Sequence, residues 1–181
     1  MKNRTAANRR KQIETVVIDG VFICYLAFLF KLLFLSRVSA HDTADSVNLI
    51  PFRSITDYLA NNSEKVRRFA FSNVIGNILI FVPLGGYLSL FRNKKKAISN
   101  LLLIAVASLL TEIIQSITHI GAADIDDLIL NSLGGFIGIL GYKLLQLLFR
   151  DDKKVHTAIT ILSLAGLPVL LYFLFVVRLR L

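Results

Sequence analysis

Five apolar stretches, each long enough to cross a lipid bilayer, constrain this chain more than any other feature. A membrane-spanning helix needs about 20 mainly apolar residues to cross a hydrocarbon core of about 30 Å. Five segments qualify, at residues 16–35, 71–91, 97–117, 128–149 and 158–177. Hydrophobic residues make up 55% of the 181 residues and charged residues only 18%. We therefore predict an all-α fold, a polytopic membrane helix bundle with about five transmembrane helices.

The positions of the basic residues predict how the chain is oriented in the membrane. They cluster before the first segment and in the loops that follow the second and fourth segments, as Lys2, Arg4, Arg9, Arg10, Lys11, Arg92, Lys94, Lys95, Lys96, Arg150, Lys153 and Lys154. Since Lys and Arg are retained on the cytoplasmic side, the N-terminus should be cytoplasmic and residues 36–70 and 118–127 outside. The net charge of +9 then reflects basic residues that set the topology and attract the chain to the lipid bilayer. It does not indicate a nucleic-acid partner.

These features predict three parts and one interfacial loop. Residues 1–15 form a basic cytoplasmic N-terminus, residues 16–154 the membrane domain, and residues 155–181 an additional C-terminal transmembrane helix. The outer loop between the first and second helices should lie at the membrane interface, with Leu49, Ile50 and Phe52 tucked into the mouth of the bundle. Arg53 should then lie over the acidic residues described next.

Charged and polar residues occur where two of the apolar segments approach the outer face. Asp124, Asp126 and Asp127 open the fourth segment, and Glu112 and Gln115 lie within the third. An unpaired ionised side chain in hydrocarbon costs at least ~2.5 kcal/mol, so such residues indicate a functional site. Helix initiation offers a structural explanation for one aspartate, as a cap, but not for all three.

Spacings of three and four residues place the polar groups on stripes of their helices. The stripes are Asn73 and Asn77 in the second segment, Ser108, Glu112, Gln115 and His119 in the third, and Asp124, Asp127, Asn131, Gly134, Gly138 and Gly141 in the fourth. We expect them to face one another around an outward-facing polar pocket. Gly134, Gly135 and Gly138 should permit close helix packing, and Pro83 should kink or break the second helix.

Four motifs in order resemble the signature of the VanZ-like family. They are Asn-Leu-Ile-Pro-Phe at 48–52, Asn-Ile-Leu-Ile-Phe-Val-Pro-Leu-Gly at 77–85, Thr-Glu-Ile-Ile-Gln at 111–115, and Asp-Ile-Asp-Asp-Leu-Ile-Leu-Asn-Ser-Leu-Gly-Gly at 124–135. The resemblance implies a small multi-pass protein of the bacterial cell membrane, in a family whose namesake is associated with teicoplanin resistance. Many relatives carry a basic residue where this chain has Gly121, Ala122 and Ala123.

Three functions are compatible with these residues. The first is a cell-envelope protein that binds a glycopeptide, a lipid-linked wall precursor or another membrane protein, and contributes to teicoplanin or lipoglycopeptide resistance. The others are a membrane enzyme acting on a lipid-linked headgroup and a small transporter. No catalytic residue and no cofactor are assigned, although Asp124, Asp126 and Asp127 offer oxygen ligands for a divalent cation. The candidate pocket residues are Asn48, Pro51, Phe52, Arg53, Asn77, Pro83, Glu112, Gln115, Asp124, Asp126, Asp127 and Asn131.

Overall fold

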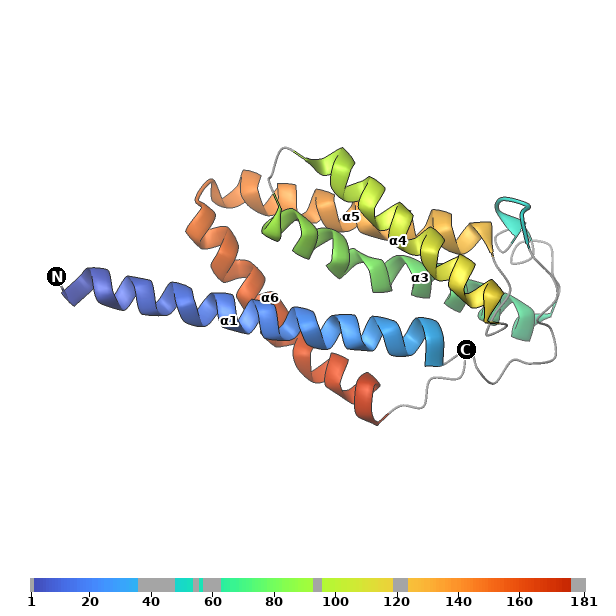
Figure 1. Ribbon diagram of the computed structural model, residues 1–181, viewed down its shortest axis with the longest axis horizontal. Helices are drawn as coiled ribbons and strands as arrows, with labels where there is room; N and C mark the ends of the chain where they lie inside the picture. Colours follow the sequence, from blue (N-terminus) through green and yellow to red (C-terminus); the bar gives the residue numbers. More distant parts are fainter. Residues whose placement is uncertain are drawn as a thin grey trace. The chain divides into compact units, whose positions relative to one another are not determined.

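The computed structural model describes residues 2–35, 48–53, 56, 63–92, 96–118 and 124–176. Its elements are α1 (Lys2–Phe30), the short π-helix η1 (Lys31–Leu35), α3 (Glu64–Phe91), α4 (Ala97–Ile117), α5 (Ile125–Phe149) and α6 (Asp152–Phe175), shown in Figure 1. Within these described residues, five helices are long and apolar enough to cross a membrane, which confirms the predicted polytopic helical architecture. Most of the predicted interfacial loop, including residues 36–47, lies outside the described residues.

All the long helices except α4 begin earlier than the hydrophobic pattern suggested, and for α5 and α6 the structure shows why. α5 begins at Ile125, so Asp126 and Asp127 lie in its first turn, where carboxylates interact favourably with the helix dipole. α6 begins at Asp152 because the side chain of Asp151 caps it, accepting a hydrogen bond from the Lys153 N–H at 2.9 Å. α3 continues through Pro83 without a break, contrary to one of the two outcomes expected for that proline.

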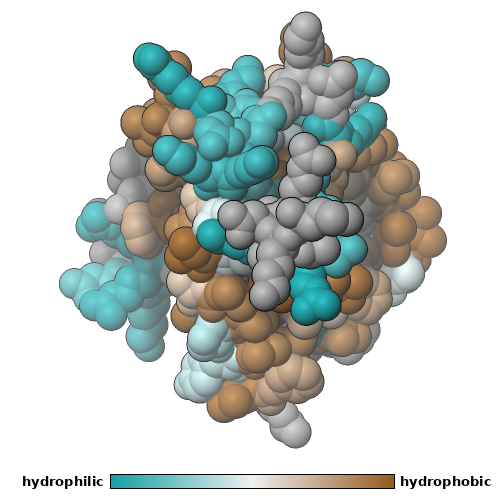
Figure 2. All heavy atoms as spheres, turned by 90° about the vertical axis from the view of Figure 1, so that its left-hand side faces the viewer, coloured by the Kyte–Doolittle hydropathy of each residue, from teal (hydrophilic) through white to brown (hydrophobic). Residues whose placement is uncertain are grey.

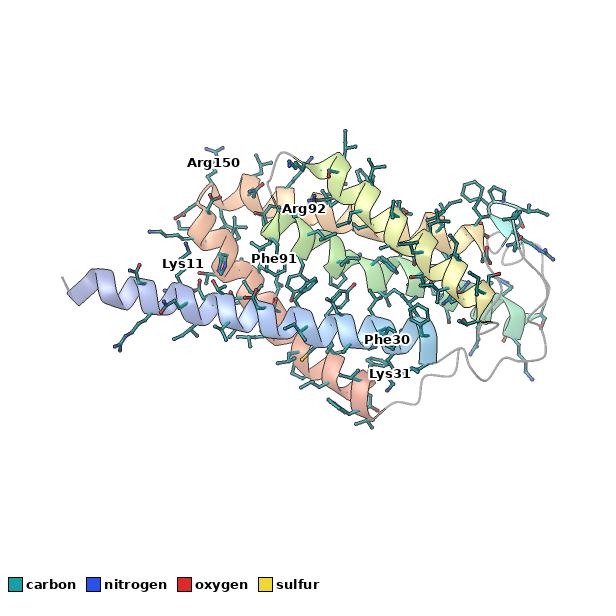
Figure 3. All side chains as sticks on the ribbon, viewed as in Figure 1. Lys11, Phe30, Lys31, Phe91, Arg92 and Arg150 are labelled. Atoms are coloured by element: carbon teal, nitrogen blue, oxygen red, sulfur yellow. The ribbon has the colours of Figure 1, made fainter. Side chains whose placement is uncertain are left out.

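The chain divides into two compact units, residues 1–36 with 144–181 and residues 37–143. In the first unit α1 packs against α6. Ile18, Val21, Tyr25 and Leu29 recur along one side of α1 and are all buried. Lys31 follows α1, at the end farther from Lys11 (Figure 3). Its ammonium donates hydrogen bonds to the carbonyl oxygens of Phe173, at 3.2 Å, and Leu174.

In the second unit α3 and α5 approach at backbone distance. A Cβ atom added to Gly134 would overlap the carbonyl oxygen of Ile78, and one added to Gly138 would overlap that of Val82. A Cβ atom at Gly85 on α3 would likewise overlap the Gly135 carbonyl on α5. Only glycine permits this close packing.

Two further glycines of α5 differ in how closely their neighbours approach. A Cβ atom at Gly135 would also meet the buried side chain of Ile104 on α4, so α5 lies against both α3 and α4 in this region. Gly141 was expected to lie on the same stripe as Gly134 and Gly138. It does not share their close packing, because nothing lies within 4 Å of a Cβ added there.

The outward-facing sides of the helices are apolar. On α4, for example, Leu102, Val106, Leu110 and Ile117 are more than half exposed. Hydrophobic residues cover much of the face drawn in Figure 2, with the hydrophilic residues gathered in patches. Such a surface suits contact with lipid tails, since leaving it in water would cost about 25 cal/mol per Å² of apolar area.

Candidate functional site

Polar side chains from α3, α4 and α5 are buried together inside the second unit. Each is at most 5% exposed, and they are Asn77, Ser108, Glu112, Gln115, Asp126, Asp127 and Asn131. All of them except Asp126 come from the stripes that sequence periodicity indicated, and we call them the buried cluster. Buried polar groups require hydrogen-bond partners, so the contacts within the cluster show how it is held.

One contact joins α3 to α5. The Asn77 side-chain amide donates a hydrogen bond to Asp127 Oδ1, and the same nitrogen lies 3.5 Å from Asn73 Oδ1 one turn earlier. Asn77 is 5% and Asp127 is 3% exposed, whereas Asn73 is half-buried. The carboxylate therefore receives a donor from a neighbouring helix at a depth where losing that donor is costly.

Hydrogen bonds also join α4 to α5 and to Asp124, the residue before α5. The Asp124 backbone N–H donates to Glu112 Oε2 at 3.0 Å, and the Asn131 amide donates to the Ser108 hydroxyl oxygen at 2.9 Å. Asn131 Oδ1 is buried, and it has no hydrogen-bond partner among the residues that the structure describes. An amide fixed at one end with an unsatisfied acceptor at the other offers a place for a donor such as water or a ligand N–H.

A second set of contacts fixes the start of α5 to the loop at residues 48–53. The Asn48 carbonyl accepts from the Ile125 N–H at 3.0 Å, and the Asn48 side-chain amide donates to Asp124 Oδ1 at the same distance. Asp124 Oδ1 also accepts from the Asp126 N–H at 2.8 Å, the geometry of a helix N-cap. Asp124 thus caps α5 and holds the loop at once.

Asp126 anchors the same loop at a second point. Its Oδ1 accepts a hydrogen bond from the backbone N–H of Phe52, whose φ of 66° lies in the left-handed region that non-glycine residues rarely adopt. Leu49, Ile50 and Phe52 are 70%, 63% and 52% exposed. The expectation that these side chains tuck into the bundle is therefore wrong, because the carboxylates bind the loop through its backbone.

Three other predicted pocket residues lie outside the buried cluster. Pro51 and Arg53 are exposed on the loop, and Pro83 is exposed on α3. A hollow of about 320 Å³ occurs elsewhere in the second unit, lined by Glu64, Arg67, Arg68 and Phe71. His119 and residues 121–123 lie outside the described residues.

The carboxylates are arranged for hydrogen bonding to N–H groups. Among the described residues, no group of three His, Cys, Asp or Glu side chains is placed to hold a metal ion.

Burial raises the pKa of Asp124 above its ordinary value, and the charges of Asp127 and Asp126 add to that effect. Hydrogen bonds from the Asp126 N–H and the Asn48 amide oppose it.

Sequence reasoning missed two residues of this region. Gly85 on α3 was not recognised as a packing partner of α5, although it follows Pro83 within the same motif. Asn100 on α4 is 1% exposed, and its side-chain oxygen has no partner within the described part of the chain. Its spacing of eight residues from Ser108 and twelve from Glu112 extends the α4 stripe and could have revealed it.

The fold and the site define a polytopic helical membrane protein with acids and amides buried where three helices meet. The sequence profile of the VanZ/LLP1 family matches residues 22–146. The chain is also 33% identical over 147 residues to Protein VanZ of Enterococcus faecium, covering 80% of this chain and 81% of that protein. The chain therefore belongs to the VanZ/LLP1 family. No solved structure matches it.

Proposed function

We propose that this chain is a resistance protein of the bacterial cell membrane that binds an amphiphilic envelope molecule and contributes to resistance to teicoplanin. The observation that carries the proposal is the burial of Glu112, Asp126 and Asp127, each at most 5% exposed, within helices that can cross a membrane. Keeping carboxylates at such positions is costly, and residues retained there usually serve function.

The accessible part of the site is its outer rim. Asn48, Asn73 and Asp124 are half-buried, whereas the acids and amides beneath them are buried. A ligand would therefore meet hydrogen-bonding groups at the rim first, and the deeper residues would hold the rim in position. The Asn131 acceptor, which has no partner among the described residues, supports a role of the deeper layer in binding one more donor.

An amphiphile fits the surroundings of the rim better than a wholly polar ligand. The neighbouring loop exposes Leu49, Ile50 and Phe52, so a molecule with a polar head and a hydrocarbon tail would find partners for both. Lipoglycopeptides and lipid-linked wall precursors share this chemistry, and the experiment below distinguishes them.

Drug susceptibility tests the cellular role. A susceptible Gram-positive host should become less sensitive to teicoplanin when it expresses the wild-type chain. The Asp124→Asn and Glu112→Gln variants should lose most of that protection at equal membrane abundance. Glu64→Gln is the matched control, because this carboxylate is 85% exposed and outside the cluster. Full protection by both Asp124→Asn and Glu112→Gln would reject the proposed site.

Binding to purified protein in nanodiscs distinguishes the ligands. Teicoplanin and a lipid-linked wall precursor are titrated separately against the wild type, Asp124→Asn and Glu64→Gln. Weaker binding of one of them to Asp124→Asn alone would identify the ligand. Binding of neither, or equal binding by all three proteins, would contradict direct recognition.

A further inference from the structure

The loop at residues 49–52 presents a continuous apolar surface. Leu49, Ile50 and Phe52 are 70%, 63% and 52% exposed, and Pro51 between them is exposed as well. Four consecutive exposed apolar residues outside a spanning helix are unusual, because in water each of the larger ones forgoes about 1.5–3 kcal/mol of burial free energy.

Hydrogen bonds hold this loop beside the first residues of the α5 span. The Asn48 carbonyl is bonded to the N–H of Ile125, the residue at which the α5 span begins, and the Phe52 N–H is bonded to Asp126 (Figure 1). The apolar side chains therefore lie beside the first residue of a helix that can span a membrane.

Three backbone groups of the loop have hydrogen-bond partners. The Ile50 N–H donates to Asn48 Oδ1 at 3.3 Å, the Phe52 carbonyl accepts from the Thr56 N–H at 2.9 Å, and Pro51 has no N–H to satisfy. With the Phe52 N–H held by Asp126, the N–H groups of both Ile50 and Phe52 have acceptors. Irregular backbone can approach hydrocarbon only when its polar groups have such partners.

We propose that residues 49–52 insert their side chains into the interface of the leaflet at which α5 begins, with the bilayer as the partner. Asp124 and Asp126 are the positioning residues that hold the loop in its inserted conformation. Arg53, exposed directly after the apolar residues, lies at the level of the lipid phosphates, as interfacial arginines do. This inference does not depend on the function proposed above.

A single tryptophan tests the insertion, since the chain contains none. The full-length Phe52→Trp variant is reconstituted into vesicles of phosphatidylcholine and phosphatidylglycerol. We expect blue-shifted emission, strong quenching by lipids labelled near the headgroup end of the acyl chain, and weak quenching by aqueous iodide. Leu49→Trp provides the same measurement if Phe52→Trp does not fold.

Two control positions calibrate the result. Leu110→Trp, on the exposed apolar side of α4, should be quenched by lipid labels and protected from iodide. Glu64→Trp, before the α3 span, should be quenched by iodide several-fold more than Phe52→Trp. If Phe52→Trp and Leu49→Trp behave like Glu64→Trp, or if their emission depends on protein density and not on lipid labels, the proposal is wrong.

Iodide quenching of Phe52→Trp also tests the positioning role of Asp126. Adding Asp126→Ala to Phe52→Trp removes the acceptor of the Phe52 N–H, and we expect iodide quenching to rise several-fold. Asp126→Asn retains a side-chain oxygen and should restore most of the protection. Unchanged quenching in Asp126→Ala would contradict the positioning role.

Discussion

Asn77 on α3 and Asp127 on α5 are joined by a hydrogen bond between side chains that are 5% and 3% exposed. This bond links two helices that can each span a membrane, at positions 50 residues apart in the chain. Because the donor has few alternatives at that depth, the pair fixes the rotation of α3 and α5 about their axes as well as their separation.

Removing the donor of this pair should destabilise the protein. Asn77→Ala leaves Asp127 without that hydrogen bond, and we expect a loss of about 1–3 kcal/mol in the free energy of unfolding. Asp127→Asn retains an acceptor oxygen and should cost less. Thermal unfolding in detergent measures both. Asn73→Ala is the control, with an expected effect within about 0.5 kcal/mol because Asn73 is half-buried. Equal stability of Asn77→Ala and Asn73→Ala would show that the pair contributes little.

Glycine substitutions should separate helix packing from helix propensity. Gly134→Ala and Gly138→Ala place a methyl group against the carbonyls of Ile78 and Val82, and we expect each to cost at least about 1–3 kcal/mol. Gly141→Ala meets nothing within 4 Å and should be neutral or stabilising by up to about 1 kcal/mol. Unfolding in a denaturant series distinguishes these outcomes, and similar effects at all three positions would contradict the close approach of α3 and α5.

The pH dependence of stability should contain a component from Asp124. Its pKa in the folded protein is raised above the ordinary value of 3.8, so the folded state holds this proton more tightly than the unfolded state. The contribution is therefore present at low pH and is lost as the pH rises from 3.8 through the folded-state pKa. Asp124→Asn cannot titrate, and the stability difference between wild type and variant should fall across that window. A stability difference that rises with pH would contradict the predicted increase in the pKa of Asp124.

In the first unit, Glu14 should stabilise the packing of α1 against α6. Its carboxylate accepts hydrogen bonds from Thr157 Oγ1 and Arg10 Nε, each at 3.0 Å, and the side chain is only 15% exposed. Glu14→Ala should cost about 1.5–3 kcal/mol, the range for hydrogen bonds to charged groups.

The control for Glu14 is an exposed ion pair of the same spacing. Glu64 and Arg68 lie 3.8 Å apart and are 85% and 84% exposed, so Glu64→Ala should cost about 0–1 kcal/mol. The two alanine variants are compared by thermal unfolding. If they lose the same stability, Glu14 does not contribute beyond an ordinary surface pair.

Hydrophobic length predicted the number of spans and most of their bounds. The span at 97–117 coincides with α4, which begins directly after Lys96, whereas α5 begins three residues before the predicted 128. The difference has a physical cause, because hydropathy excludes aspartates that a helix N-terminus accommodates well. Residue periodicity likewise placed Asn77, Glu112 and Asp127 on stripes, but a stripe does not specify which helix it faces.

By itself, the sequence determined that this chain is a membrane helix bundle of the VanZ/LLP1 family, since apolar length and motif order are properties of the linear chain. The tertiary structure decided which polar groups meet. Close approach at Gly134 and Gly138 sets the register of α3 against α5 and so brings Asn77 to Asp127. It also decided that the loop binds Asp126 through its backbone and turns Phe52 outward, because a sequence pattern records side chains and not the partners of backbone N–H groups.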